Sequence, residues 1–281
     1  MIDPIALIEL TNLKAADKLE ELAQHPQIGM KPGWMDELAR NKAWPIRSAL
    51  ASNPAISANT EVVSRISKDR SKNVRISLAA NPAIAIFPEI TKNRSSDKHP
   101  DVRESLASNP AIINFPEVAE TLSRDEKSFV RAALAKNPAL KKFPAIIKNL
   151  ALDSTSHVRW YLAKNPATSA CSATIEKLST DDNPTVRYCL AQNPALAEFP
   201  ETIEKLATDE DWLVRHYLSR NPSLASFPQI VELLAIDESP TVRRSLALNP
   251  AIPSGTASIG PWANTSHPCA PSPAIQEYRA S

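Results

Sequence analysis

Aromatic, basic and amide side chains recur at regular intervals through the middle and second half of the chain. The candidate binding residues are Lys136, Trp160, Tyr161, Lys164, Tyr188, Gln192, His216, Tyr217, Arg220 and Arg244. Rings of this kind can stack on nucleobases while Lys and Arg contact phosphates. Trp, Tyr and Arg are equally the residue types that anchor protein interfaces. The set predicts a surface for a protein or peptide partner, with a nucleic acid as the alternative.

Neither catalysis nor metal binding is expected of this set. A general acid or base must lie within hydrogen-bond reach of its substrate. Glu104, the carboxylate at an equivalent position of the repeating pattern described below, stands two repeats before Trp160. His216, a single imidazole among tyrosines, is typical of a contact residue, and the other histidines share no spacing: His25, His99, His157 and His267. We expect no enzyme activity, no metal site and no cofactor.

Composition excludes several classes of protein. The chain has 281 residues, of which 43% are hydrophobic, so it can bury a substantial core. Its net charge of +1 gives no overall attraction to nucleic acid or to an anionic membrane. It has 4 glycines and none between residues 34 and 254. A Walker loop or a dinucleotide-binding loop needs glycines where the backbone approaches phosphate, so kinase and Rossmann classes are excluded.

The cysteines and the first residues bear on the compartment. Cys171, Cys189 and Cys269 are odd in number and form neither a CxxC pair nor a zinc-type Cys/His spacing. The first residues carry acids within their apolar stretch and favour a helix over a signal peptide. No run of 18 apolar residues occurs. We expect a soluble, cytoplasmic protein without a membrane partner.

An Asn-Pro dipeptide marks a repeat that fills most of the chain. Its asparagines are 28 residues apart: Asn53, Asn81, Asn109, Asn137, Asn165, Asn193, Asn221 and Asn249. A degenerate copy, His25-Pro26, lies one period earlier. A fixed period of this length is typical of stacked helical repeats.

Each repeat predicts two short helices. Segments such as Val74 to Asn81 place Val and Leu four residues apart, on one helical face. Pro after Asn ends that helix, because its ring cannot continue the hydrogen-bond ladder. A later Pro-Glu pair, as in Phe87 to Glu89, favours the start of the next helix. In stacks of this kind the Val/Leu helix lines the concave surface, so the candidate residues are expected there.

An acidic and a basic residue also recur in every repeat. An Asp precedes an Arg by six residues, from Asp69 and Arg75 to Asp237 and Arg243. The pair predicts a ladder of ion pairs that runs through the stack and fixes its register.

The pattern VRxxLAxNP resembles the leucine-rich repeat variant family, and the Asp-to-Arg spacing resembles HEAT repeats. The resemblance covers about residues 17–252. It implies an all-α, right-handed α-solenoid of 28-residue helix-pair repeats that binds a protein or nucleic acid on its concave face. The variant repeat is usually nearer 24 residues, and this chain lacks the cysteines of the family member that carries an iron–sulfur cluster. A DNA-glycosylase-like role is the enzymatic alternative, because some HEAT-like glycosylases place Trp and Arg on the same face.

The resulting domain prediction has three parts. Residues 1–44 form an N-terminal cap with the degenerate first repeat, residues 45–252 form tandem helical repeats, and residues 253–281 form a flexible tail rich in Pro and Ser. The expected function is a non-catalytic scaffold for a protein or peptide.

Overall fold

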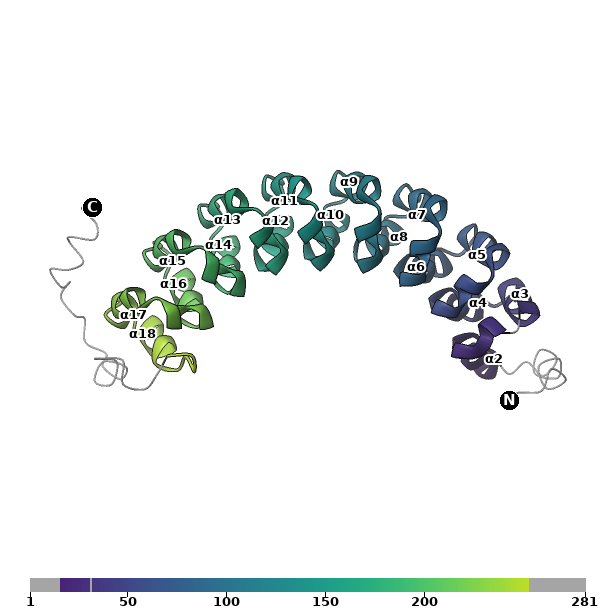
Figure 1. Cartoon of the computed structure of the whole chain (residues 1–281), viewed down its shortest axis with the longest axis horizontal. Helices are drawn as coiled ribbons and strands as arrows, with labels where there is room; N and C mark the ends of the chain where they lie inside the picture. The colour runs from purple at the N-terminus through teal and green to yellow at the C-terminus, as the bar shows by residue number, and fades with distance from the viewer. Residues whose placement is uncertain (1–15, 31, 253–281) are drawn as a thin grey trace. The chain divides into compact units, whose positions relative to one another are not determined.

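The computed structural model describes residues 16–30 and 32–252, and within these residues every regular element is helical (Figure 1). The first fifteen residues of the expected cap and the expected tail lie outside them. The chain divides into two compact units, Met1–Ala139 and Leu140–Ser281. The α-helices of the first unit are α2 (Ala16–Gln24), α3 (Pro32–Arg40), α4 (Trp44–Ser52), α5 (Thr60–Ser67), α6 (Lys72–Ala80), α7 (Pro88–Ser95), α8 (Pro100–Ala107), α9 (Pro116–Ser123) and α10 (Ser128–Lys136).

The second unit continues the same order. Its α-helices are α11 (Pro144–Ala151), α12 (Ser156–Lys164), α13 (Ser172–Ser179), α14 (Pro184–Ala191), α15 (Pro200–Ala207), α16 (Trp212–Ser219), α17 (Pro228–Ala235) and α18 (Pro240–Ala247). The prediction of two α-helices per repeat is confirmed.

The connector inside each repeat is a 3₁₀ helix, which the sequence reasoning did not assign. These helices are η1 (Pro26–Met30), η2 (Pro54–Ala58), η3 (Pro82–Ile86), η4 (Pro110–Asn114), η5 (Pro138–Lys142), η6 (Pro166–Ala170), η7 (Pro194–Glu198) and η8 (Pro222–Ser226). η2 to η8 begin at the Pro of the Asn-Pro dipeptide, and η1 begins at the Pro of His25-Pro26, where the fixed φ of proline suits a first helical position.

Within each unit the elements pack in rows. In the second unit α12, α14, α16 and α18 pack one on the next, and we call them the even row; α11, α13, α15 and α17 form the odd row. The 3₁₀ helices η6, η7 and η8 pack in a third row. The first unit repeats this with α2, α4, α6, α8 and α10 in sequence. Consecutive repeats therefore pack as an α-solenoid, which confirms the expected fold class.

The core lies between the rows and follows the predicted stripe. Val186 and Leu190 of α14 are fully buried, as are Ile203 and Leu206 of α15. Burying a side chain of this size contributes about 1.5–3 kcal/mol relative to exposure. Because every repeat supplies the same stripe, each repeat covers the apolar face of its neighbour.

The asparagine of the dipeptide links consecutive repeats. Asn193 Oδ1 accepts from the Ala195 N–H at 2.9 Å and caps η7. Its Nδ2 donates to the Ala163 carbonyl at 2.8 Å and the Asn165 carbonyl at 3.1 Å, both in the preceding repeat. The same two inter-repeat bonds are made by Asn53, Asn81, Asn109, Asn137, Asn221 and Asn249. Asn-Pro ends a helix, as predicted, and also fastens one repeat to the next.

The predicted ion-pair ladder is present and has a definite register. Arg187 donates from Nε and Nη2 to Asp209 at 2.7 and 2.9 Å, and from Nη1 to the Asp181 carbonyl at 2.8 Å. Arg187 thus pairs with the aspartate 22 residues later and bonds the carbonyl six residues earlier. The same spacing joins Arg47–Asp69, Arg75–Asp97, Arg103–Asp125, Arg159–Asp181 and Arg215–Asp237.

The ladder also stabilises the charged form of Asp181. Burial acts to raise the pKa of Asp181, but hydrogen bonds from Arg159 and from the Asn183 N–H outweigh it. The pKa of this carboxyl therefore lies below its usual value. These arginines and aspartates are engaged in packing and do not form a series of binding sites.

Helix α7 departs from the pattern of the odd-numbered helices. Arg94 occupies the position that Leu122 fills in α9 with a fully buried side chain. Arg94 Nη1 pairs with Asp97 at 2.6 Å, although Asp97 already pairs with Arg75 at 2.8 Å. Burial lowers the pKa of Arg94, Asp97 raises it, and the charge of Arg75 lowers it further. Two guanidinium groups share one carboxylate here, so the third repeat carries an excess buried charge.

Candidate binding surface

The even row of the second unit brings most of the candidate residues together. Helix α12 carries Trp160, Tyr161 and Lys164; α14 carries Tyr188, with Gln192 directly after it; α16 carries His216 and Tyr217, with Arg220 directly after it; and α18 carries Arg244. Lys136 ends α10, lies in the first unit and is exposed there. We call the second-unit residues, together with His157 and Trp212 described next, the aromatic–basic strip.

His157 was missed as a contact residue by the sequence reasoning. Its imidazole stacks on the Trp160 ring, with centroids 5.5 Å apart and planes 13° apart, and meets Tyr161 edge-on at 4.9 Å. Trp160 and Tyr161 are themselves 4.4 Å apart. The Lys164 ammonium lies 5.8 Å from the centroid of Trp160. The i, i+3 and i+4 spacing of these residues on one helix was the available signal.

Trp212 was also missed. It is the first residue of α16, is 44% exposed, and meets the His216 ring at 6.1 Å. His216 contacts Tyr217 at 5.0 Å, and Tyr217 packs against Tyr188 of α14 at 4.8 Å. A continuous series of rings therefore joins α14 to α16. Trp212 recurs at the repeat position held by the half-exposed Trp44 of α4, and this recurrence could have identified it.

Several contacts between successive even-numbered helices join residues that are 29 positions apart in the sequence. Tyr188 contacts Tyr217, and His216 Nδ1 lies 2.8 Å from Ser245 Oγ. In the first unit Ser48 and Ser77 are joined at 2.7 Å, and Ser105 Oγ donates to the Ile76 carbonyl at 3.0 Å. One edge of each such ring therefore packs on the next helix, and Trp160, Tyr188, His216 and Tyr217 are half-buried.

Solvent-facing charge on the strip is positive. Lys164, Arg220 and Arg244 are exposed, as is the amide Gln192. Helices α12, α14, α16 and α18 contain no Asp or Glu, whereas the buried arginines Arg187 and Arg215 of α14 and α16 are paired in the ladder. The strip combines aromatic surface with cations that no carboxylate of the same helices neutralises.

Burial shifts His216 of the strip and the neighbouring Cys189 toward their neutral forms. Burial lowers the pKa of His216, and the charge of Arg220 lowers it further, while a hydrogen bond with the Thr241 backbone raises it. Burial raises the pKa of the Cys189 thiol to about 11, although Lys164 and the indole N–H of Trp160 both act to lower it. Cys189 is therefore a protonated, buried thiol and not a nucleophile.

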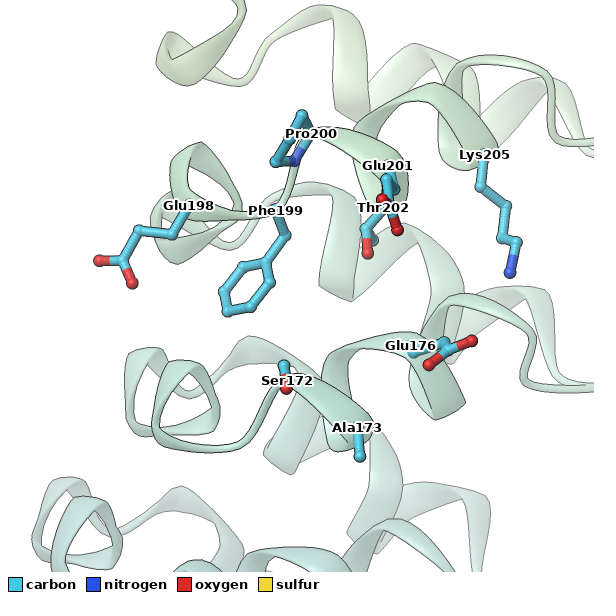
Figure 2. Close-up of a pocket in the computed structure, with 9 residues that line it drawn as sticks. All are labelled: Ser172, Ala173, Glu176, Glu198, Phe199, Pro200, Glu201, Thr202 and Lys205. Carbon is cyan, nitrogen blue, oxygen red and sulfur yellow. The ribbon is translucent and has the colours of Figure 1, made fainter.

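The odd row of the second unit presents a contrasting surface. An open pocket of about 600 Å³ between α13 and α15 is lined by Glu176, Glu198, Phe199, Glu201 and Lys205 among others. Figure 2 shows the Phe199 ring pointing toward Ser172, with the carboxylates spread around the rim. This pocket, lined by three carboxylates and one ammonium group, contrasts in charge with the strip.

In the first unit the even row holds a different groove. A hollow of about 480 Å³ is lined by Ile76, Ala80, Glu104 and neighbouring serines of α8. Burial, and to a lesser degree Asp101, raises the pKa of Glu104. Aromatic rings are absent from the lining of this groove. It does not share the chemistry of the aromatic–basic strip.

Among residues 16–30 and 32–252, no group of three or more His, Cys, Asp or Glu side chains is arranged to hold a metal ion. Over the same part of the chain, no helix combines the length and the apolar character needed to cross a bilayer.

The comparisons with known proteins return a structural likeness. No family model matches the sequence, and no curated protein matches it. A solved structure described as a leucine-rich repeat variant with a novel repetitive protein structural motif is similar to this chain. It is 19% identical, the match covers 77% of this chain and 80% of that chain, and the TM-score is 0.49. This is the kind of repeat that the VRxxLAxNP motif resembles; the class of the molecule, an α-solenoid, follows from its own helix rows.

Proposed function

We propose that the protein is a non-catalytic scaffold that binds a protein or peptide partner on the aromatic–basic strip. The observation that supports this most strongly is the co-location of Trp212, Tyr188 and Trp160 with the exposed cations Lys164, Arg220 and Arg244 in one row of helices. Aromatic residues and arginine dominate the energetics of protein interfaces. The absence of carboxylates from the helices of this row favours a partner with acidic residues.

The ring geometry favours a protein over a single-stranded nucleic acid. Bases stack on ring faces. The His157 ring covers one face of Trp160. The rings of Tyr188 and Tyr217 pack against each other, with centroids 4.8 Å apart and planes tilted by 31°. Ring edges and the phenol groups remain for contact, and these suit side chains of a folded or extended polypeptide.

The surroundings of His216 support a contact role over catalysis. Its ring is held by Ser245 Oγ and the Thr241 backbone, both on α18, and no carboxylate of α14, α16 or α18 orients it. A Ser-His pair needs such a third group to act as a nucleophile and base. The pair instead joins α16 to α18.

The test is a selection from a random dodecapeptide phage library on the purified full-length protein. We expect the selection to enrich acidic peptides that bind wild type. Their affinity for Arg220→Ala/Arg244→Ala should be lower by at least about tenfold, and their affinity for the odd-row variant Lys148→Ala should equal that for wild type. Enrichment of peptides that bind all variants equally would contradict the assignment of this surface.

A further inference from the structure

The row of helices has a spacing that selects the conformation of its partner. Resting on the proposed function, we propose that the aromatic–basic strip binds an extended, polyproline-II-like segment with an acidic residue at every third position. The segment crosses α12, α14, α16 and α18 in turn, rather than lying along any one helix.

The helix spacing fixes the period. Packed helices have axes about 8–10 Å apart. A polyproline II segment has three residues per turn and a rise of about 3.1 Å, so side chains on one face recur every 9 Å or so. A β-strand places same-face side chains about 7 Å apart, and a helix places i and i+4 about 6 Å apart along its axis. Only the three-residue period advances by one helix of the row at each step.

Polar side chains, two of them cations, occur in register with that period on three successive helices. Lys164, Gln192 and Arg220 are 28 residues apart and occupy the same place after successive even-row helices. All are exposed. After the last helix the same position holds the exposed Leu248, and the next cation is Arg244, four residues earlier at the repeat position of His216. An acidic side chain at every third position would meet Lys164, then the Gln192 amide, then Arg220, and finally the region of Arg244.

Aromatic rings lie on the same helices, on the N-terminal side of these polar residues. Tyr188 with Tyr217 spans α14 and α16, and Trp212 with its exposed edge stands at the start of α16. Aromatic-lined grooves are the usual docking surface for polyproline II segments, because such segments are already extended and lose little entropy on binding. Residues between the acids, proline above all, would lie against these rings.

The experiment uses three fluorescent peptides of identical composition and charge. Each contains four glutamates in a background of proline, alanine and serine. The glutamates stand at every second position in one peptide, at every third in another and at every fourth in the last. Anisotropy titration of the full-length protein should show that the three-residue spacing binds tightest, by about fivefold or more. Gln192→Lys adds the missing cation and should tighten the three-residue peptide by about another threefold, with less effect on the others. Lys148→Ala is the matched control.

The outcomes separate this inference from the function on which it rests. Equal affinity for all three peptides, or a preference for two- or four-residue spacing, overturns the inference while leaving strip-dependent peptide binding intact. Peptides that bind wild type and Arg220→Ala/Arg244→Ala equally overturn both. A single-stranded oligonucleotide that binds the strip more tightly than every peptide also overturns both.

Discussion

The ring of Tyr188 on α14 lies 4.8 Å from the ring of Tyr217 on α16, two residues separated by 29 positions in sequence. The same separation joins His216 to Ser245 and Ser48 to Ser77. This position of the repeat therefore stabilises the contact between helices and also faces the solvent. A partner that binds here meets side chains already fixed by packing, which reduces the entropy lost on binding.

The Tyr188–Tyr217 contact should be measurable by a double-mutant cycle. Single Tyr→Leu variants and the double variant should show a coupling of about 0.5–1.5 kcal/mol in the free energy of unfolding, as expected for a ring pair. Urea denaturation followed by circular dichroism provides the measurement. A coupling of zero would mean that the rings do not interact in solution.

Asn193→Ala should be strongly destabilising. The substitution removes two inter-repeat hydrogen bonds and the cap of η7. The Ala163 carbonyl and the Ala195 N–H lose these partners, whereas the Asn165 carbonyl still accepts from Thr168. Since each buried unsatisfied group costs about 1–3 kcal/mol, we expect a loss of about 3 kcal/mol or more in unfolding free energy. The neighbouring exposed residue gives the control, and Gln192→Ala should change stability by less than about 0.5 kcal/mol. Similar effects of both variants would contradict the role of these asparagines in joining consecutive repeats.

Arg94→Leu should stabilise the protein. The substitution restores the apolar residue found at this position in other odd-numbered helices and removes one of two guanidinium groups that share Asp97. Asp97 keeps its partner Arg75, so no buried charge is left unpaired. We expect a gain of about 1 kcal/mol or more, observed as a higher midpoint in urea. A loss of stability would show that Arg94 has contacts whose value exceeds its desolvation cost.

His216 should make stability depend on pH in a known direction. Its folded pKa lies below the usual value of about 6.5, so the unfolded chain binds its proton more tightly. The stability from neutral His216 is complete above the unfolded pKa and is lost as pH falls from there toward the folded pKa. His216→Gln should therefore remove part of the loss between about pH 7 and pH 5. Identical pH profiles of wild type and variant in thermal melts would contradict this.

The fold could be predicted from the sequence because one local pattern is repeated without insertions. Val186 and Leu190 lie on the apolar face of their helix, and the Asn-Pro dipeptide that begins at Asn193 marks where the helix ends. The 3₁₀ helix was not predicted, because five residues with Pro at the start carry no periodicity that distinguishes it from a turn. The pairing of Arg187 with Asp209 rather than Asp181 was equally hidden, since it depends on how one repeat stacks on another.

The candidate site was predicted less completely. Trp160, Tyr188 and His216 share one position of the 28-residue repeat and could be identified from the sequence. His157 and Trp212, which contact Trp160 and His216 along a single helix, were not identified. The rings are half-buried because they contact the next helix, and the amino-acid sequence alone does not show these contacts. The assignment of charge was more direct, because exposed Lys164 and Arg220 lie where the helical projection puts them.

The most direct test of the central claim is an anisotropy titration that compares a strip-selected acidic peptide with single-stranded and duplex oligonucleotides, at low and physiological salt. We predict that the peptide binds wild type at both salt concentrations. We predict that Trp160→Ala and Arg220→Ala/Arg244→Ala each abolish this binding. We predict no strip-dependent binding of either oligonucleotide at physiological salt, where phosphate contacts are weakened by counterion competition. Oligonucleotide binding that these variants abolish, with no peptide binding at any salt, would show that the strip recognises nucleic acid instead.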